Sequence, residues 1–509
     1  MARASLLLLS LSPLLISANE PPLPSRSTAK IDPKTILVLF GTRHGNRNPE
    51  RFVNEPSRKW GKEGELELTS IGKRQAYGLG KEIRAFVGPF IDSNYIPSQS
   101  KFYSSSANRC QMTLQSAVAG IYVPNDWADW NKKRLDNWSP VPYTIDDPLL
   151  RMYSVKGCVE SDQAWDPISK DTLPDLKELV ERSKPLLNYM KEKDGRDATI
   201  SNAADIADNI INMDFYNATY PDWLANPTLS GYTATTIKKA FLSFAENHMN
   251  RCASYKPCRN MMGGLWADHI IKSLDAAAAG TPKTPRLIGY ASHTEVTLAV
   301  MLILGIQKSE LTTSAGFVIE LRNNSVPPHV RVLQHDPNPI DAHVIYPAHL
   351  VPELSSKSDT NGWMPLSALK EFVARSSFSD WESQCGIDRC SIQAAAQTAA
   401  QPNSALSAAT AANCQYSDSL SSIECNQLID TLECSHPHTQ SYCARSCFCS
   451  GKSIPPPQLN SQSISVSQLG GSPSVISQSG GSPSVVASVP LSYQTFPDGY
   501  TASFYNIGK

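Results

Sequence analysis

Short apolar runs alternate with longer amphipathic stretches over much of the chain, and this pattern predicts an α/β fold. After Thr69, a typical helix N-cap residue, apolar side chains recur on one face to about residue 86 and predict a helix. The strongly apolar stretch from 296 to about 306 predicts a second, buried helix. Apolar runs predict strands at 36–40, 102–104, 286–290, 315–321 and 330–334.

Composition and periodicity divide the chain into five segments. The main domain, 33–390, is expected to hold a mainly parallel sheet with flanking helices and an inserted helical cap domain at about 150–280. The tail repeats Gly-Gly-Ser-Pro-Ser-Val and cannot bury enough apolar surface to fold, so we expect it to be disordered. The remaining boundaries place a signal peptide at 1–18, a linker at 391–413, a small disulfide-rich module at 414–449 and the tail at 450–509.

The first residues have the features of a secretory signal. Arg3 precedes an apolar stretch at 6–16, and the small residues Ser17 and Ala18 follow, so we place cleavage after Ala18. No later run approaches the ~20 apolar residues of a membrane helix, and the C-terminus lacks the hydrophobic tail of a lipid-anchor signal. We therefore expect a secreted, extracellular protein without a membrane anchor, rather than one of a lysosomal-type compartment.

The net charge of −1 gives no basic field for nucleic acid and no reason to expect a membrane surface as partner. Secretion makes disulfides the expected state of the 12 cysteines. Cys385 and Cys390 are close enough in sequence for a local bridge. The other four cysteines of the main domain are expected to pair within it, with no basis for assigning partners: Cys110, Cys158, Cys252 and Cys258. Sequons that predict a glycoprotein begin at Asn137, Asn217 and Asn323.

The densest group of reactive side chains follows the first predicted strand, where residues 41–49 read Gly-Thr-Arg-His-Gly-Asn-Arg-Asn-Pro. A chain that leaves a parallel strand delivers its next residues to the carboxyl edge of the sheet, where open α/β folds bind ligands. Arginine forks match phosphate oxygens, and a histidine can attack phosphorus. The segment predicts a phosphate-transfer site with His44 as nucleophile between Arg43 and Arg47. The alternative is a loop whose arginines form surface ion pairs around a structural histidine.

The complete pattern Arg-His-Gly-x-Arg-x-Pro resembles the signature of the histidine acid phosphatases. Trp-Ser-Pro-Val-Pro at 138–142 resembles their prostatic and lysosomal branch in particular. The resemblance covers most of the main domain, with further similar segments at 68–75, 103–109 and 290–295.

This resemblance implies hydrolysis of small-molecule or protein phosphate monoesters, in which His44 becomes a covalent phosphohistidine. It implies that no metal or other cofactor is needed, because arginine side chains stabilise the phosphoryl charge. Homodimers occur in the resembling branch, but nothing in the sequence identifies an interface. The side chains implied to bind the substrate phosphate are Arg43, Arg47, Arg109 and His293.

The chain departs from its prostatic and lysosomal relatives at the proton donor. That branch has His-Asp, whereas Thr294 follows His293 here and Glu295 comes next. A threonine hydroxyl is too weak an acid to replace a carboxyl group. The inositol polyphosphate phosphatase branch has His-Ala-Glu, which the local sequence resembles, so we expect Glu295 to be the proton donor. In the alternative, Glu295 only favours the N-terminus of the following helix and the enzyme is weak.

The six cysteines between residues 414 and 449 permit about 15 pairings, so spacing alone cannot give their connectivity. Their spacing resembles the ShKT modules of secreted proteins, and attachment to an unknown extracellular partner is the role that this resemblance favours. It also implies three pairs: Cys414 with Cys449, Cys425 with Cys443, and Cys434 with Cys447.

Three functional hypotheses follow. The first is a secreted acid phosphatase of broad monoester specificity, and the second is a phytase-like inositol phosphate phosphatase, suggested only by Glu295. The third is a catalytically weak or inactive secreted binding protein. The full set of arginines and histidines around the nucleophile argues against the third.

Overall fold

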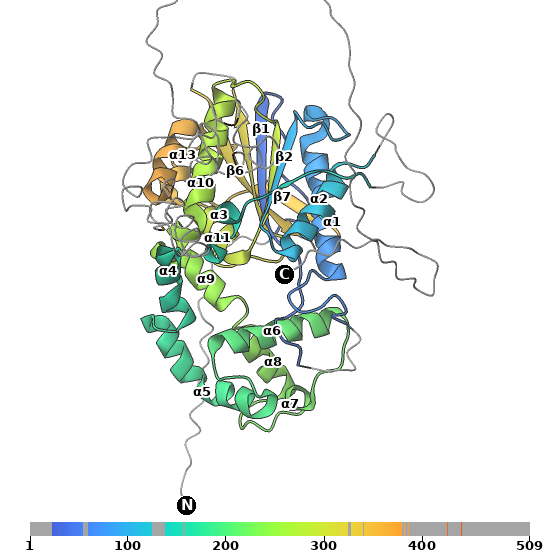
Figure 1. Cartoon of the computed structure of the whole chain (residues 1–509), viewed down its shortest axis with the longest axis vertical. Coiled ribbons are helices and arrows are strands. Elements are labelled where there is room, and N and C mark those ends of the chain that lie inside the picture. Colours follow the sequence, from blue (N-terminus) through green and yellow to red (C-terminus); the bar gives the residue numbers. More distant parts are fainter. Residues whose placement is uncertain are drawn as a thin grey trace, which may run out of the picture. The chain divides into compact units, whose positions relative to one another are not determined.

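The computed structural model describes residues 23–53, 60–124, 138–155, 158–323, 327–338 and 340–378, together with residues 381, 385, 425 and 439. Its centre is an eight-stranded mixed sheet with strand order β3-β2-β4-β1-β5-β6-β7, in which β8 pairs with β6 (Figure 1). The strands are β1 (Thr35–Arg43), β2 (Ser100–Ser104), β3 (Thr144–Ile145), β4 (Leu287–Ser292), β5 (Gly316–Arg322), β6 (His329–Pro337), β7 (His343–Pro347) and β8 (Trp363–Pro365).

The parallel half of the sheet creates the edge on which the site is built. Strands β1 and β2 both pair in parallel with β4, so Arg43 lies beside Ser292 and Ser104 lies beside Ala291 at the carboxyl ends of the three strands. The other half is antiparallel, and it includes the expected late pair, β5 with β6. The prediction of an α/β fold is confirmed.

Helices cover both faces of this sheet, because β1 is apolar on both sides. Val38 and Phe40 pack in one core with helices α1 (Ser70–Val87) and α2 (Asn108–Ile121). Leu37 and Leu39 belong to the opposite core, with α10 (Lys256–Ala278), α11 (Thr294–Ile303) and α13 (Leu366–Val373). Figure 1 shows α1 and α2 on one side of the strands and α10 and α13 on the other.

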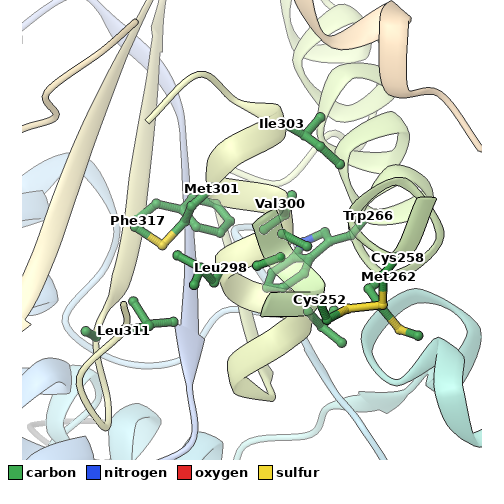
Figure 2. Packing of buried hydrophobic residues seen from close by; sticks show 14 of the residues in the cluster. Cys252, Cys258, Met262, Trp266, Leu298, Val300, Met301, Ile303, Leu311 and Phe317 are labelled. Atoms are coloured by element: carbon green, nitrogen blue, oxygen red, sulfur yellow. A yellow bond between two sulfur atoms is a disulfide. The ribbon is translucent and has the colours of Figure 1, made fainter. Parts of the chain in front are cut away.

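The second core is built around α10 and α11. Figure 2 shows Trp266 of α10 packed near Leu298 and Val300 of α11, with Phe317 of β5 on the sheet side. The predicted helix after Thr69 is confirmed as α1, and the Thr69 hydroxyl accepts a hydrogen bond from the Gly72 backbone N–H, as an N-cap does.

The chain between β3 and α10 is mostly helical. Figure 1 shows α6, α7 and α8 set beyond the ends of the strands. We call α4 to α9 the cap helices: α4 (Val159–Ser169), α5 (Pro174–Asp194), α6 (Ile200–Phe215), α7 (Asp222–Ala225), α8 (Ala234–Leu242) and α9 (Asn247–Ser254). The remaining short elements are α3 (Asp147–Leu150), α12 (Pro352–Ser355) and the 3-10 turns η1 (Gly88–Phe90), η3 (Met152–Ser154) and η4 (Ala374–Ser376).

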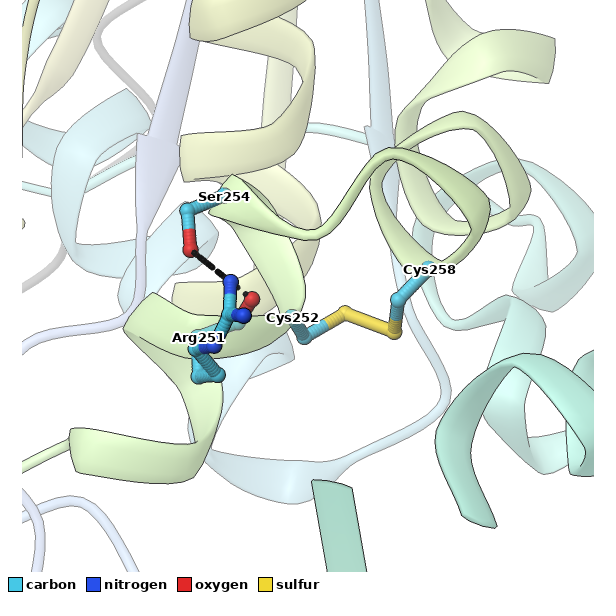
Figure 3. The surroundings of a disulfide bond; sticks show 4 residues. All are labelled: Arg251, Cys252, Ser254 and Cys258. Carbon is cyan, nitrogen blue, oxygen red and sulfur yellow. Dashed lines mark hydrogen bonds between the residues drawn. A yellow bond between two sulfur atoms is a disulfide. The ribbon is translucent and has the colours of Figure 1, made fainter. Parts of the chain in front are cut away.

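The structure contains two disulfides within the main domain, and one of them corrects a predicted pair. Cys385 pairs with Cys158 across 227 residues of sequence, so the local bridge predicted between Cys385 and Cys390 is wrong. The fold brings Cys385 back to the start of α4, and sequence proximity carries no information about such a contact. Cys252 pairs with Cys258 and ties the end of α9 to the start of α10 (Figure 3).

Cys110 is a buried free thiol, so the prediction that it pairs within the domain is also wrong. It lies in α2, where its sulfur donates to the Ser292 carbonyl oxygen at 3.2 Å. Fold geometry places this sulfur in the core beside the site, away from the two disulfides.

Several predictions fall outside the described residues: the signal peptide, linker and tail, Asn137, Cys390 and most of the cysteine module. Cys425 is disulfide-bonded. Asn217 and Asn323 are exposed, as glycosylation acceptors must be. Among the described residues, no helix has the length and apolar content needed to span a membrane.

Candidate active site

The backbone of His44 is held at the carboxyl edge of the sheet. Its N–H donates to the Ser292 carbonyl at 2.9 Å, and its carbonyl accepts from the Ser314 N–H at 3.0 Å. The next residue must be glycine, because a Cβ on Gly45 would lie 2.4 Å from the Gly72 carbonyl oxygen. The start of α1 therefore packs directly against residues 41–49, the predicted nucleophile segment.

The His44 ring is buried, and its hydrogen bonding leaves one ring nitrogen with a lone pair. It is 2% exposed, and its Nδ1 lies 2.8 Å from the Gly45 carbonyl oxygen. A carbonyl only accepts, so Nδ1 carries the hydrogen and Nε2 keeps its lone pair. Burial, followed by the positive charges of Arg109 and Arg43, lowers the pKa of His44 well below its ordinary value. The ring is therefore neutral, as a nucleophile must be.

Arg43 ends β1 and is fixed by two contacts. One terminal nitrogen donates to the Leu311 carbonyl and the other to the Glu246 carboxylate, in an ion pair whose side chains are 5% and 15% exposed. Its Nε is buried and has no hydrogen-bond partner among the described residues. The Nε–H of this guanidinium is thus available to a ligand.

Arg47 is held by a cap helix. A terminal nitrogen lies 2.9 Å from the Asp208 carboxylate of α6, and the other donates to the Asn48 carbonyl at 2.9 Å. Asn212, one turn after Asp208, donates to the Arg47 carbonyl at 3.0 Å. The polar face of α6 therefore fixes both the side chain and the backbone of Arg47.

Arg109 and His293 meet across the ends of β2 and β4. Arg109, in the first turn of α2, donates to Nδ1 of His293 at 3.2 Å, and Nε2 of His293 is left to donate to the Ser105 hydroxyl at 2.9 Å. The His44 and His293 rings stand edge to face with centroids 5.7 Å apart. Burial and the charge of Arg109 lower the pKa of His293, and the Nε of Arg109 is buried without a partner among the described residues.

Glu295 lies in the first turn of α11 and is 7% exposed. Burial raises the pKa of its carboxyl group, and the nearby Glu246 carboxylate raises it further, while Arg109 and Arg43 act in the opposite direction. The side chain of Thr294 hydrogen-bonds to Glu246. The structure therefore brings all six site residues expected from sequence to one edge of the sheet.

The structure also adds residues that the sequence interpretation missed. Glu246 and Asp208 pair with the two arginines of the nucleophile segment. Tyr153 of η3 packs edge-on against His293 with ring centroids 5.5 Å apart, and Arg151 lies over the Tyr153 ring. Polar residues at 205, 208, 209 and 212 recur at helical spacing on α6, which could have indicated a functional face. Glu246 follows no such pattern.

The arrangement can bind and attack a phosphate group. The neutral His44 imidazole has a free lone pair, and three arginines surround it. The Nε–H groups of Arg43 and Arg109 are buried and have no acceptor among the described residues, so both can donate to phosphate oxygens. Among the described residues, no group of three or more His, Cys, Asp or Glu side chains is placed to hold a metal ion.

Comparison with known proteins agrees with this chemistry. Residues 37–329 match the sequence profile of the histidine phosphatase superfamily (branch 2). The chain is 24% identical to lysosomal acid phosphatase of Xenopus laevis over 280 residues, which cover 53% of this chain and 62% of that protein. It is 23% identical to prostatic acid phosphatase of Bos taurus over 400 residues, or 76% of this chain and 95% of that protein.

Among solved structures, the phytase of Klebsiella sp. ASR1 has the same fold, with a TM-score of 0.51 and 13% identity over 69% of this chain and 96% of that one. The profile match spans more than half of the chain, and the two relatives compared by sequence are acid phosphatases. The chain therefore belongs to branch 2 of the histidine phosphatase superfamily.

Proposed function

We propose that this protein is an acid phosphatase that hydrolyses phosphate monoesters through a covalent phosphohistidine on His44. The observation that carries the proposal is the pair of buried Nε donors, on Arg43 and Arg109, that have no partner among the described residues. A buried donor without an acceptor is costly, and phosphate oxygens match guanidinium groups well. Both donors belong to arginines whose charge acts on His44. This set favours a phosphate group beside Nε2 of that ring.

In the first step, the lone pair of His44 Nε2 forms a bond to phosphorus while the bond between phosphorus and the ester oxygen breaks. Glu295 gives its proton to that oxygen, and an alcohol leaves. In the second step, water attacks phosphorus, its proton passes to the Glu295 carboxylate, and the N–P bond breaks with its electron pair returning to Nε2. Inorganic phosphate leaves. The arginines offset the charge on the equatorial oxygens throughout.

Glu295 is the proton donor in this proposal because its environment favours the protonated carboxyl. A general acid must carry its proton at the working pH, and burial raises the pKa of Glu295 in that direction. Glu246 has the opposite character, since Arg43 and Arg47 lower its pKa against the effect of burial. The Thr294 hydroxyl is bonded to Glu246 and is too weak an acid for the role.

The charges around the site favour esters with a single phosphate, on small molecules or proteins. Glu246 and Asp208 place two carboxylates against Arg43 and Arg47, and these repel additional phosphates on a substrate. A phytase-like activity, suggested by the His-Thr-Glu sequence at 293–295, would require a site able to accept a densely charged ring.

We also propose that the protein is exported. The disulfides Cys158–Cys385 and Cys252–Cys258 support this, because such bonds persist in oxidising compartments. The exposed positions of Asn217 and Asn323 support glycosylation at those sequons.

Purified protein tests the activity directly. We expect hydrolysis of p-nitrophenyl phosphate at acid pH, much weaker release of phosphate from inositol hexakisphosphate, and loss of both in His44→Ala. Preferred hydrolysis of inositol hexakisphosphate would instead support the phytase-like alternative. An inactive wild type that is folded would contradict the proposed function.

A further inference from the structure

We propose that Glu246 is a positioning residue for this reaction: from the cap, its carboxylate orients Arg43 and supplies the negative charge beside the acid Glu295. The inference rests on the proposed function and extends it, because it joins the cap to the chemistry at the sheet edge. The side chain of Thr294, the residue next to Glu295, hydrogen-bonds to Glu246.

The backbone holds Glu246 in an unfavourable conformation. Its φ is 55°, in the left-handed region that residues with a Cβ rarely adopt. It is the N-cap residue of α9, but its side chain makes no capping hydrogen bond to that helix. The carboxylate instead reaches Arg43. Backbone strain without a local capping role is typical of a residue kept for its side chain.

Glu246 determines which N–H groups of the Arg43 guanidinium remain available to a ligand. One terminal nitrogen of Arg43 donates to the Leu311 carbonyl and the other to Glu246, so Nε is the nitrogen of this guanidinium that has no partner within the described part of the chain. Loss of the carboxylate would free the guanidinium to rotate about its last bonds. The Arg43 N–H that would donate a hydrogen bond to phosphate is thus held in place by a residue more than 200 positions away in the sequence.

The same carboxylate acts on the acid across the site. Glu295 lies in the field of Glu246, which disfavours its ionisation, and of Arg109 and Arg43, which favour it. Tyr153 also faces Glu295. The charged and titratable groups that face Glu246 itself are Arg43 at the end of β1, Arg47 in the following segment, Asp208 on α6 and Glu295 on α11. Removing the Glu246 charge therefore lowers the pKa of Glu295.

The test compares the pH dependence of kcat in four proteins: wild type, Glu246→Gln, Glu246→Gly and the control Lys283→Gly. Gln keeps the size of the side chain without its charge. Gly removes the side chain and relieves the left-handed backbone, so this variant folds even where Gln is poorly tolerated. Lys283 is exposed and has a φ of 65°, so Lys283→Gly relieves similar strain away from the site.

Two substrates separate the two roles. In Glu246→Gly we expect kcat/KM for p-nitrophenyl phosphate to fall by about tenfold or more, because Arg43 is no longer held in place. In Glu246→Gln it should fall less, because the amide oxygen still accepts a hydrogen bond from Arg43. For glycerol 2-phosphate, whose alcohol must be protonated as it leaves, the high-pH limb of kcat should also move by about one pH unit towards acid. Lys283→Gly should show neither effect.

If the high-pH limb of kcat for glycerol 2-phosphate does not move in either Glu246 variant, the inference is overturned, whatever the overall activity of the variants. A purely structural role for Glu246 would change the rate without changing the titration of Glu295. Unchanged kcat/KM in Glu246→Gly would overturn the inference as well. Failure of the wild type to hydrolyse p-nitrophenyl phosphate would instead overturn the proposed function on which the inference depends.

Discussion

The Asp208 carboxylate lies 2.9 Å from a guanidinium nitrogen of Arg47, so a cap helix neutralises one of the two arginines of the nucleophile segment. Burial is the largest influence on Asp208 and raises its pKa, and the neighbouring Glu246 raises it further, while Arg47 lowers it. Acidification therefore protonates Asp208 more readily than an ordinary aspartate. Protonation releases Arg47 from its partner and leaves more positive charge for an anionic substrate.

We expect Asp208→Asn to bind inorganic phosphate more tightly at neutral pH. The gain should be about fivefold, on the order of 1 kcal/mol for one nearby charge. Competitive inhibition by phosphate across a range of pH measures it, and the variant should lose part of the pH dependence seen in wild type. Asp166→Asn, which breaks the exposed pair with Lys170, is the matched control and shares any titration of phosphate itself. Weaker phosphate binding in Asp208→Asn would contradict this account of Arg47.

Glu295→Gln should discriminate between leaving groups. Glycerol 2-phosphate needs a proton on its departing oxygen, so kcat should fall by about 100-fold or more, whereas p-nitrophenyl phosphate should lose much less. Glu310→Gln, at an exposed position, serves as control. Equal and small effects on both substrates would show that Glu295 only favours the start of α11.

Buried histidines make the free energy of unfolding depend on pH in the acid range. Burial lowers the pKa of His335 to about 4, and the pKa of His343 beside it is also lowered. The unfolded chain takes up a proton at His335 near its ordinary value of about 6.5, whereas the folded chain does not until about pH 4. Stability is therefore lost as pH falls from about 6.5 to 4, by up to about 3 kcal/mol for His335 alone. Urea unfolding at several pH values measures it, and a flat profile over this window would contradict the burial of a neutral ring.

The two disulfides should differ in what they contribute. The Cys158–Cys385 bond closes 227 residues of chain and the Cys252–Cys258 bond only 6. Loop-closure entropy then predicts a loss of about 5 kcal/mol for Cys158→Ala with Cys385→Ala, against about 2 kcal/mol for Cys252→Ala with Cys258→Ala. Urea unfolding of the two double variants compares them. Equal losses would show that native-state packing, rather than chain entropy, dominates.

The fold and the placement of His44 and His293 were accessible from local sequence pattern, whereas Arg109 and Glu295 were assigned only through resemblance to a known family. The apolar run at 36–40 predicts β1, Thr69 predicts the start of α1, and the strand at 286–290 brings His293 to the same edge as His44. Parallel pairing then brings the residues that follow these strands to one site, since strands aligned in parallel place their carboxyl ends together.

Contacts made through space were not accessible. Nothing adjacent to Glu246 in sequence indicates that it meets Arg43, because the contact depends on how the cap helices fold back over the sheet edge. The pairing of Cys158 with Cys385 could not be predicted from the sequence for the same reason. Asp208 could have been noticed as part of a polar face of α6, but the identity of its partner, Arg47, could not.

The central claim is that His44 becomes phosphorylated during turnover. Folded wild-type enzyme should be mixed with a radiolabelled phosphate monoester and quenched within milliseconds in alkaline denaturant, which preserves phosphohistidine. We predict protein-bound label that is released by acid, none in His44→Ala, and retained label in the control His329→Ala on β6. Label retained by His44→Ala, or turnover by wild type without any protein-bound label, would contradict the account.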